Sequence, residues 1–542
     1  MTDVVLLNLN FYGVPEIQEP IGIEQLAGVL RHRGFTVRLV DPTVRGDSME
    51  ETLEVLLQDP GRVLGIGAFS DQTATMKQVG ELVERLRRRG CQSHVTLGGY
   101  GATIRHREYL EGMPEVGSVV LGGGEYAFPE LVERVLAGRE LDGLRGVAYR
   151  SGGAVVSSRP RRVDDLDALP FPARDLLEAR RELYGERTMA YVLAGNGCPF
   201  QCTYCSIKSY LASQEGPVYC KKSPEKIVEE IDSVVSRYGV TNFTLLDDNF
   251  VVPDREGMDR LRALRDGLAE RGLRVRLLVM TRPDSITEEA VDILKEAGVK
   301  SIFIGVEAVH PEDLKIYNRK GSQHVDRALE ILKSRGFGLD LDSDLRCRIG
   351  FISFNPFSSL ETLRANVDFF RRHRIPPKTL FQRVRIHKNT ELRAIVEEAG
   401  LLVKGDADQH MDYSEEVYRF KHPEVASIYR LAEKLFRERY GVRQRIRRVE
   451  KCVRLQGLEA PGEPLDGLAA EVDHLLVEFL GSLVEEAAAG GGDVDGRLEE
   501  SYDRYSRRLD EFCRRHDLER RLGELEDWLK RNGWYITADF HL

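Results

Sequence analysis

Three cysteines lie within eight positions of one segment, GCPFQCTYCSIK at residues 197–208. Cys198, Cys202 and Cys205 have the spacing C-x3-C-x2-C and directly follow an apolar run that predicts a strand. Thiolates at this spacing are metal ligands, and three of them leave one coordination position open. A structural zinc site would need a fourth ligand from far along the chain. An iron–sulfur cluster would instead keep one iron open to a reacting molecule.

The chain has 542 residues, of which 42% are hydrophobic and 31% charged, as in globular proteins of three or four domains. Its net charge of −10 argues against nucleic-acid binding, which needs a basic face. The segment MTDVVLLNLNFYG predicts a buried strand rather than a signal peptide, and no apolar run is long enough to predict a membrane span. The other five cysteines are scattered, which is typical of a cytoplasmic protein.

Strand and helix patterns alternate over residues 1–150. Apolar runs predict strands at 4–10, 36–41, 63–69, 94–99 and 118–124, and amphipathic segments such as 23–34 and 76–90 predict helices between them. Such apolar runs indicate a parallel sheet covered by helices on both faces. We predict a Rossmann-like α/β domain that binds ligands beyond the C-terminal ends of its strands. The proline- and glycine-bearing stretch 151–185 predicts a linker.

A second α/β series occupies residues 186–400. Strands are predicted at 189–198, 242–248, 275–280, 301–307, 348–354 and 379–386, with helices between them. Ser223 followed by Pro224 predicts the start of the helix at 223–239. Six βα units in sequence predict a partial or complete β/α barrel. Residues 401–542 predict a mainly helical C-terminal domain, with a break between two helices at the glycines of 490–492.

The cysteine motif, with Tyr204 before its last cysteine and a barrel strand before its first, resembles the radical S-adenosylmethionine (SAM) superfamily. The resemblance implies a [4Fe-4S] cluster held by Cys198, Cys202 and Cys205, whose open iron chelates SAM. It also implies that an electron from the cluster splits SAM and releases a 5′-deoxyadenosyl radical. Three thiolates hold the cluster, and a fourth would block the co-substrate.

Later segments resemble the SAM-contacting elements of that superfamily. The segment LLDDNF places Asp247, Asp248 and Asn249 where the family contacts the amine of SAM, although acids here would also cap the next helix. The segment GVKSIFIGVEA resembles the element in which Gly305 lets SAM approach and Glu307 makes a polar contact. The resemblance also implies a SAM contact from Arg319 or Lys320, and an adenine position along 349–356.

The domain at 1–150 resembles the cobalamin-binding domain of one radical SAM subclass. Glycine turns would let the backbone approach a large flat ligand, although glycines after strands are also ordinary βα turns. The resemblance implies cobalamin contacts from Phe69, Ser70, Gly98, Gly99, Gly122, Gly123 and Glu125. The motif D-x-H-x-x-G is missing, so we expect His32, His94 and His106 to be structural. The residue beneath cobalt would come from 69–73 or 10–12.

Together the two modules resemble cobalamin-dependent radical SAM methyltransferases of antibiotic biosynthesis. These include phosphinothricin P-methyltransferases and the fosfomycin-pathway and aminocoumarin C-methyltransferases. The resemblance implies transfer of a methyl group from SAM, through methylcobalamin, to an unactivated carbon or a phosphinate phosphorus. It also implies a flavodoxin or ferredoxin as electron donor. The basic stretch 437–454 would receive an anionic substrate or an acidic carrier protein, or is simply a solvated helix face.

Three other classes compete with a methyltransferase. Radical SAM cyclases and rearranging enzymes carry the same two modules without methylating. A tRNA methylthiotransferase would bring three more cysteines in its N-terminal domain, whereas residues 1–150 contain only Cys91. A regulatory protein would need a basic recognition helix, and the sequence has no such pattern.

Overall fold

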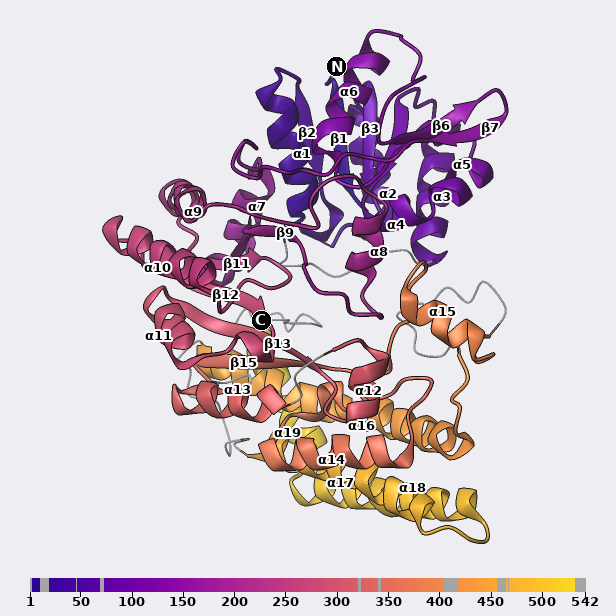
Figure 1. Ribbon diagram of the computed structural model, residues 1–542, viewed down its shortest axis with the longest axis vertical. Helices are drawn as coiled ribbons and strands as arrows, with labels where there is room; N and C mark the ends of the chain where they lie inside the picture. Colours follow the sequence, from indigo (N-terminus) through magenta and orange to yellow (C-terminus); the bar gives the residue numbers. More distant parts are fainter. Residues whose placement is uncertain are drawn as a thin grey trace.

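The computed structural model contains two large sheets and a helical C-terminal region (Figure 1). It describes residues 2–9, 19–44, 46–68, 73–319, 323–339, 343–403, 418–455, 465 and 467–531. Among the helices of those ranges, none is both long and apolar enough to cross a bilayer.

The first sheet has seven strands in the order β2-β1-β3-β4-β5-β6-β7. Its five parallel strands are those predicted from the apolar runs: β1 (Val4–Asn8), β2 (Val37–Val40), β3 (Val63–Gly67), β4 (His94–Gly98) and β5 (Ser118–Val120). Two antiparallel strands that the sequence did not predict extend the sheet, β6 (Val147–Ser151) and β7 (Ala154–Ser157). The first sheet therefore reaches into the stretch expected as a linker.

Helices cover both faces of this sheet, as the doubly wound prediction requires. One apolar core lies against α2 (Met49–Gln58), α3 (Thr73–Arg88) and α5 (His106–Gly112). The other core lies against α1 (Ile21–His32) and α6 (Gly124–Leu136). The C-terminal ends of β4 and β5, with their glycine turns, are left to face the second half of the molecule.

The second sheet has six parallel strands in the order β14-β15-β13-β12-β11-β8. Its strands are β8 (Met189–Leu193), β11 (Asn242–Leu246), β12 (Arg276–Thr281), β13 (Val299–Glu307), β14 (Phe337–Gly338) and β15 (Leu345–Phe351). Its outer face is covered by α9 (Pro224–Tyr238), α10 (Arg255–Glu270), α11 (Glu288–Glu296), α13 (Gln323–Ser334) and α14 (Leu360–His373). Ser223 caps α9 as predicted, because its side chain accepts a hydrogen bond from the Lys226 amide.

The strand predicted at 379–386 is wrong. Residues Pro377–Thr379 form a short 3-10 helix, and only one isolated bridge, Phe354 to Arg383, follows it. Two prolines at 376 and 377 disfavour a ladder here because they lack amide donors. The apolar side chain of Phe381 stacks on Phe436 of the C-terminal region at 4.8 Å, so its burial comes from helix packing rather than from a sheet.

The C-terminal helices share one continuous apolar core with the second sheet and its helices. They are α16 (Pro423–Leu455), α17 (Leu468–Ala488), α18 (Val494–Arg515) and α19 (Leu518–Arg531), and the predicted glycine break separates α17 from α18. Helix α17 packs along α14, where Arg364 pairs with Glu485 and Arg371 with Glu478. The C-terminal helices therefore stabilise the sheet that carries the cysteine loop.

A buried ionic network joins the two sheets. Arg174, which precedes α7 (Asp175–Tyr184), donates to Glu19 at 2.5 Å and to Glu230 of α9 at 2.6 Å. Lys222 also binds Glu230 at 2.6 Å. Glu24 of α1 is fully buried in the same network, and burial together with the adjacent Glu19 raises the pKa of Glu24 well above its ordinary value. Burial and Glu19 therefore favour the protonated form of Glu24.

We predict that Glu24→Gln stabilises the protein, and does so more at pH 8 than at pH 5. The folded protein keeps a proton on Glu24 that the unfolded chain releases above the ordinary glutamate pKa, so wild-type stability falls as pH rises. Glutamine removes this loss because it is neutral in both states. Chemical denaturation at the two pH values measures the difference.

Glu130→Gln, on the exposed face of α6, is the control and should change little at either pH. A Glu24→Gln variant less stable than wild type at pH 8 would show that Glu24 is ionised and paired with Arg174.

Candidate active site

The cysteine loop follows a short hairpin at the C-terminal end of β8. The hairpin pairs β9 (Gly195–Gly197) with β10 (Tyr219–Lys221), and Cys198 comes directly after it. Gly197 has a φ of +95°, and a Cβ there would collide with the Val218 carbonyl, so only glycine fits this position. Cys205 precedes the first residue of α8 (Ser206–Ala212), so the loop is fixed at both ends.

Other elements hold the middle of the loop. The Thr203 amide donates to the Tyr317 carbonyl at 3.2 Å, and the Thr203 hydroxyl donates to the Ile316 carbonyl at 2.7 Å. The Leu392 amide of α15 (Glu391–Glu398) donates to the Thr203 carbonyl at 3.0 Å. These bonds tie the loop to α12 (Pro311–Ile316) and to α15, which fixes where the three thiols lie.

The three thiols lie in one poorly hydrated environment. Cys202 is buried, and burial raises the pKa of Cys198 to about 11 and raises the pKa of Cys205. The pKa of Cys198 is also raised by Asp248, Cys205 and Cys202, so these three side chains lie near its thiol. Thiols with raised pKa values need a bound cation to become thiolates, which is what metal ligation supplies.

The arrangement does not support a single zinc ion at the cysteine loop. Over the described ranges, no three His, Cys, Asp or Glu side chains are gathered closely enough to hold one metal ion. A tetrahedral zinc needs thiolates about 2.3 Å from one centre, and no remote histidine joins this trio. An iron–sulfur cluster would instead bind each of the three thiolates through a different iron.

Asp247, Asp248 and Asn249 lie at the end of β11, as predicted, but their side chains differ in what they can bind. Asp247 is buried and accepts hydrogen bonds from the Tyr219 hydroxyl at 2.8 Å and the Asn249 amide at 2.9 Å. Asn249 is also buried and donates to the Val251 carbonyl. Asp248 is exposed and has no hydrogen-bond partner among the described residues. The surrounding protein, together with Asp247, raises the pKa of Asp248 to about 7.

Glu307 lies at the end of β13 and faces the cysteine loop. It has a φ of +66°, which is uncommon for a residue other than glycine and is typical of strained functional positions. Burial raises the pKa of Glu307, whereas the adjacent Arg319 and Tyr204 lower it. A Cβ at Gly305 would lie 2.8 Å from the Glu307 carboxylate, so the predicted glycine leaves room for that side chain.

Arg319 connects these residues to the cysteines. Its guanidinium donates to the Gly305 carbonyl, to the Tyr204 hydroxyl at 3.3 Å and to Cys202 Sγ at 3.8 Å. Burial opposes its charge, but Tyr204 and Glu307 outweigh burial and raise the pKa of Arg319. Arg319 is therefore a fixed cation beside one cysteine sulfur. The other basic candidate, Lys320, lies outside the described residues.

The glycine turns of the first sheet meet α8 on the far side of the cysteine loop. The Gly123 amide donates to the Gln214 side chain at 3.3 Å, and Tyr100 packs on Tyr210 of α8 at 5.6 Å. Gly122 has a φ of +67°, and a Cβ there would lie 2.6 Å from Gln214. The turns after β4 and β5 are thus built to contact the helix that begins at the cysteine motif.

The turns also carry features that fit a large ligand with amide groups. A Cβ at Gly98 would meet nothing within 4 Å, and Gly99 has a φ of +98°. One Glu125 carboxylate oxygen is buried without a hydrogen-bond partner in the described part of the chain, and burial raises the pKa of Glu125. An orphaned buried oxygen of this kind fits an amide donor on a bound ligand.

Some predicted cobalamin contacts cannot be placed. Phe69 and Ser70 lie outside the described residues, as do residues 10–12 and 71–72, which were expected beneath cobalt. His94 is partly buried and bonds to the Ser118 hydroxyl at 2.8 Å, and its burial lowers the pKa of His94 to about 4. His106 bonds through Nδ1 to the Thr103 carbonyl. Both histidines have the structural contacts that we expected.

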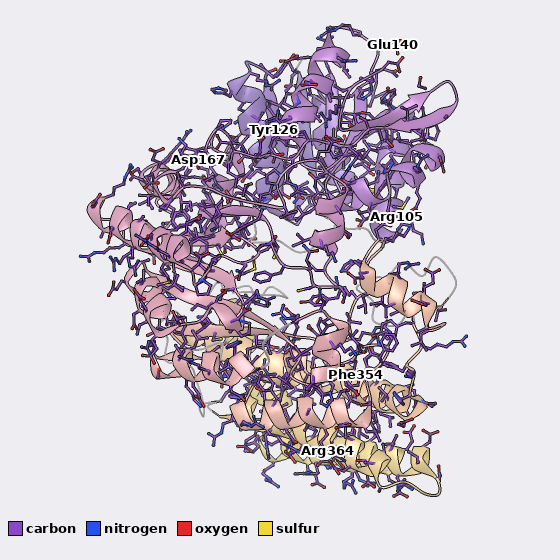
Figure 2. All side chains as sticks on the ribbon, in the orientation of Figure 1. Arg105, Tyr126, Glu140, Asp167, Phe354 and Arg364 are labelled. Atoms are coloured by element: carbon purple, nitrogen blue, oxygen red, sulfur yellow. The ribbon has the colours of Figure 1, made fainter. Side chains whose placement is uncertain are left out.

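A contact between α15 and the first domain closes one side of the site. Lys388, just before α15, binds Glu108 of α5 at 2.9 Å. Arg105, labelled in Figure 2, also binds Glu108 and lies at the edge of the domain nearest α15. The sequence analysis did not identify the Lys388–Glu108 ion pair, and it also missed Tyr219 and Gln214. Each of these residues contacts a partner far away along the chain.

The basic stretch 437–454 provides no free anion site among its described side chains. Arg443 binds Asp473 in a buried pair, and Arg445 binds Glu519 and Glu526. Arg437 and Arg447 pair with glutamates on the same helix. Arg443 and Arg445 therefore join α16 to the other C-terminal helices. Arg439, Arg448, Lys451 and Arg454 lie outside the described side chains, so binding of an anionic substrate by this stretch stays a prediction.

Two family models match the chain in the order that the sequence predicted. Residues 13–132 match the B12 binding domain, and residues 192–341 match the radical SAM superfamily. The solved structure of the cobalamin-dependent S-adenosylmethionine radical enzyme OxsB, with aqua-cobalamin and S-adenosylmethionine bound, has the same fold. It matches with a TM-score of 0.80 and 18% identity over 97% of this chain and 83% of that chain.

Curated relatives are more similar in sequence. An uncharacterized methyltransferase of Pyrococcus horikoshii is 25% identical over 65% of this chain and 73% of its own length. A hopanoid C-3 methylase of Methylococcus capsulatus is 28% identical over 59% of each chain. An anaerobic magnesium-protoporphyrin IX monomethyl ester cyclase of Rubrivivax gelatinosus is 24% identical over 58% of this chain and 57% of its own. The chain therefore combines a B12-binding domain with a radical SAM domain, which is the pair of modules that cobalamin-dependent radical SAM enzymes carry.

Proposed function

We propose that this enzyme transfers a methyl group from SAM to an unactivated carbon, or to a phosphinate phosphorus, of a small natural-product intermediate. The observation that supports this most strongly is the position of α8. Its first turn follows Cys205, and its far end contacts the glycine turns of the B12-binding domain. A cluster site and a cobalamin site therefore share one wall, as a reaction that uses both requires.

Cys198, Cys202 and Cys205 would hold the [4Fe-4S] cluster. When bound, the cluster supplies the electron that splits SAM, and cobalamin supplies the methyl carrier. Arg319 stabilises the negative sulfur of Cys202 through the contact at 3.8 Å, which would raise the potential of the site. The hairpin and α12 hold the three sulfurs in place without offering a fourth protein ligand.

Asp248 and Glu307 would bind SAM. Asp248 is the one acid of its segment with no protein partner in the described ranges, so it is free to accept the ammonium group of SAM. Asp247 acts indirectly, because its two hydrogen bonds to Tyr219 and Asn249 fix the turn that presents Asp248. Gly98, Gly99, Gly122, Gly123 and Glu125 would support cobalamin.

A cyclase or rearrangement enzyme is the second candidate, because relatives in Rubrivivax gelatinosus and Cereibacter sphaeroides are named cyclases. The antibiotic-pathway substrate, the flavodoxin or ferredoxin donor and the cytoplasmic location stay predictions. The names of two relatives, a methyltransferase and a methylase, favour methyl transfer.

The first prediction concerns the cysteine trio. Anaerobically reconstituted wild-type protein should bind roughly four irons per chain, whereas Cys202→Ala should bind few and should release 5′-deoxyadenosine at least about a hundred-fold more slowly. Cobalamin binding should be unchanged in the variant. Cys220→Ala is the control, because this thiol lies on β10 near the site but bonds only to backbone carbonyls. Deoxyadenosine release that survives in Cys202→Ala would contradict the assignment.

The second prediction concerns the hairpin that presents the loop. Gly197→Ala should lose most of its iron, because the new Cβ would meet the Val218 carbonyl in addition to a backbone strain of about 1–3 kcal/mol. Gly239→Ala shares the positive φ but has open space around its Cβ, so it should keep its iron. Equal iron contents in the two variants would show that the hairpin does not position the cluster ligands.

The third prediction separates methyl transfer from cyclisation. Protein loaded with cobalamin and reduced with titanium(III) citrate should release about one S-adenosylhomocysteine per bound cobalamin when SAM is added. Cys202→Ala should release the same amount of S-adenosylhomocysteine, since transfer of the methyl group from SAM to reduced cobalamin does not need the cluster. An enzyme that cyclises without methylating would produce 5′-deoxyadenosine from SAM but no S-adenosylhomocysteine.

A further inference from the structure

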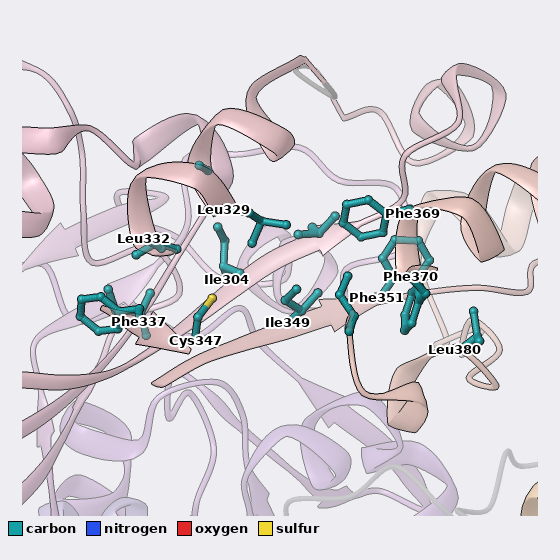
Figure 3. Close-up of a cluster of buried hydrophobic side chains, with 14 of the residues drawn as sticks. Ile304, Leu329, Leu332, Phe337, Cys347, Ile349, Phe351, Phe369, Phe370 and Leu380 are labelled. Carbon is teal, nitrogen blue, oxygen red and sulfur yellow. The ribbon is translucent and has the colours of Figure 1, made fainter. Parts of the chain in front are cut away.

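Arg348 has an unusual position on β15, in the middle of the second sheet. Its neighbours along the strand, Cys347 and Ile349, are buried against the helices on the outer face (Figure 3). Because side chains alternate along a strand, Arg348 projects from the opposite, inner face.

The inner face at Arg348 is the face that carries the SAM-binding residues. A Cβ at Gly350 would lie 2.7 Å from the Phe303 ring and 3.6 Å from the Glu307 carboxylate. Gly350 is two residues after Arg348, so both point toward the same side, about 7 Å apart along the strand. Arg348 therefore lies one layer deeper in the barrel than Glu307.

The barrel is closed enough to enclose this guanidinium. Tyr191 on β8 interacts electrostatically with Arg348, although three strands separate β8 from β15 in the sheet. In a flat sheet the two strands would lie about 19 Å apart. The sheet must therefore curve until its two sides face each other, with Arg348 between them.

Arg348 has no anionic partner in the described part of the chain. It makes no hydrogen bond or ion pair there, and burial lowers the pKa of its guanidinium. Arg346, two residues earlier on the same face, differs because its Nε donates to the Ser343 carbonyl at 3.0 Å. A partly buried cation without a partner destabilises a protein, so its presence indicates a function that needs the charge.

We propose that Arg348 binds the anionic group of the substrate, a carboxylate, phosphate or phosphonate, inside the barrel. This inference rests on the proposed function, because it places the substrate between Arg348 and the end of the strands where SAM is cleaved. The guanidinium offers a planar pair of N–H donors that matches these anions in a bidentate geometry. The anionic group at this depth holds the rest of the substrate toward the cysteine loop, so Arg348 is a specificity-determining residue.

The test compares Arg348→Met with the matched control Arg346→Met in the anaerobically reconstituted protein. Thermal transitions are recorded with and without millimolar methylphosphonate or acetate as probes. We expect Arg348→Met to melt at or above the wild-type temperature, because methionine removes a buried unpaired charge. The probes should raise the transition of wild type and Arg346→Met by a few degrees, and should leave Arg348→Met unchanged.

Three results of the thermal measurements would overturn the proposal. A transition several degrees lower in Arg348→Met would mean that the arginine has a structural partner. Probes that stabilise all three proteins equally, or none of them, would mean that the anion does not bind at Arg348.

Release of 5′-deoxyadenosine after dithionite reduction is the third readout. Its loss in Arg348→Met alone would mean that Arg348 binds SAM rather than substrate. Its absence from wild type would instead contradict the proposed function, while the probe results still report on Arg348.

Discussion

The structure depends on one constraint, which is that three thiols must be held in place while a fourth ligand position stays empty. A loop of eight residues cannot achieve this alone, so other elements restrain it from every side. The hairpin fixes Cys198 through Gly197, and α8 fixes Cys205. Hydrogen bonds from Thr203 tie the centre of the loop to α12. Asp248 and Glu307 are the groups that we propose to orient the cationic co-substrate beside this loop.

The two halves of the enzyme must also keep a fixed relation, because a methyl group moves over only short distances. The buried network around Arg174 joins both sheets, and α15 adds a second contact through Lys388. Buried ionic networks specify geometry more than they add stability. Burial of Glu24 in this network raises its pKa, which is an energetic cost of the arrangement.

Much of the fold was predictable because buried parallel strands are continuous apolar runs in the sequence. The strand predicted at 379–386 failed because its apolar residues pack on α16 instead of pairing with a neighbouring strand. The cysteine trio, Asp248 and Glu307 were predictable from local motifs. Tyr219, Gln214 and Arg348 were not, because the importance of each depends on residues that only the folded chain brings near.

The central claim is that one iron of the cluster is left uncovered by the polypeptide and binds SAM. Electron paramagnetic resonance of the reduced cluster tests this directly, in anaerobic protein with and without SAM. We predict a [4Fe-4S] signal whose g-values shift when SAM is added, because SAM becomes a ligand of the uncovered iron. A signal unchanged by SAM, or zinc in place of iron at the cysteine loop, would contradict it.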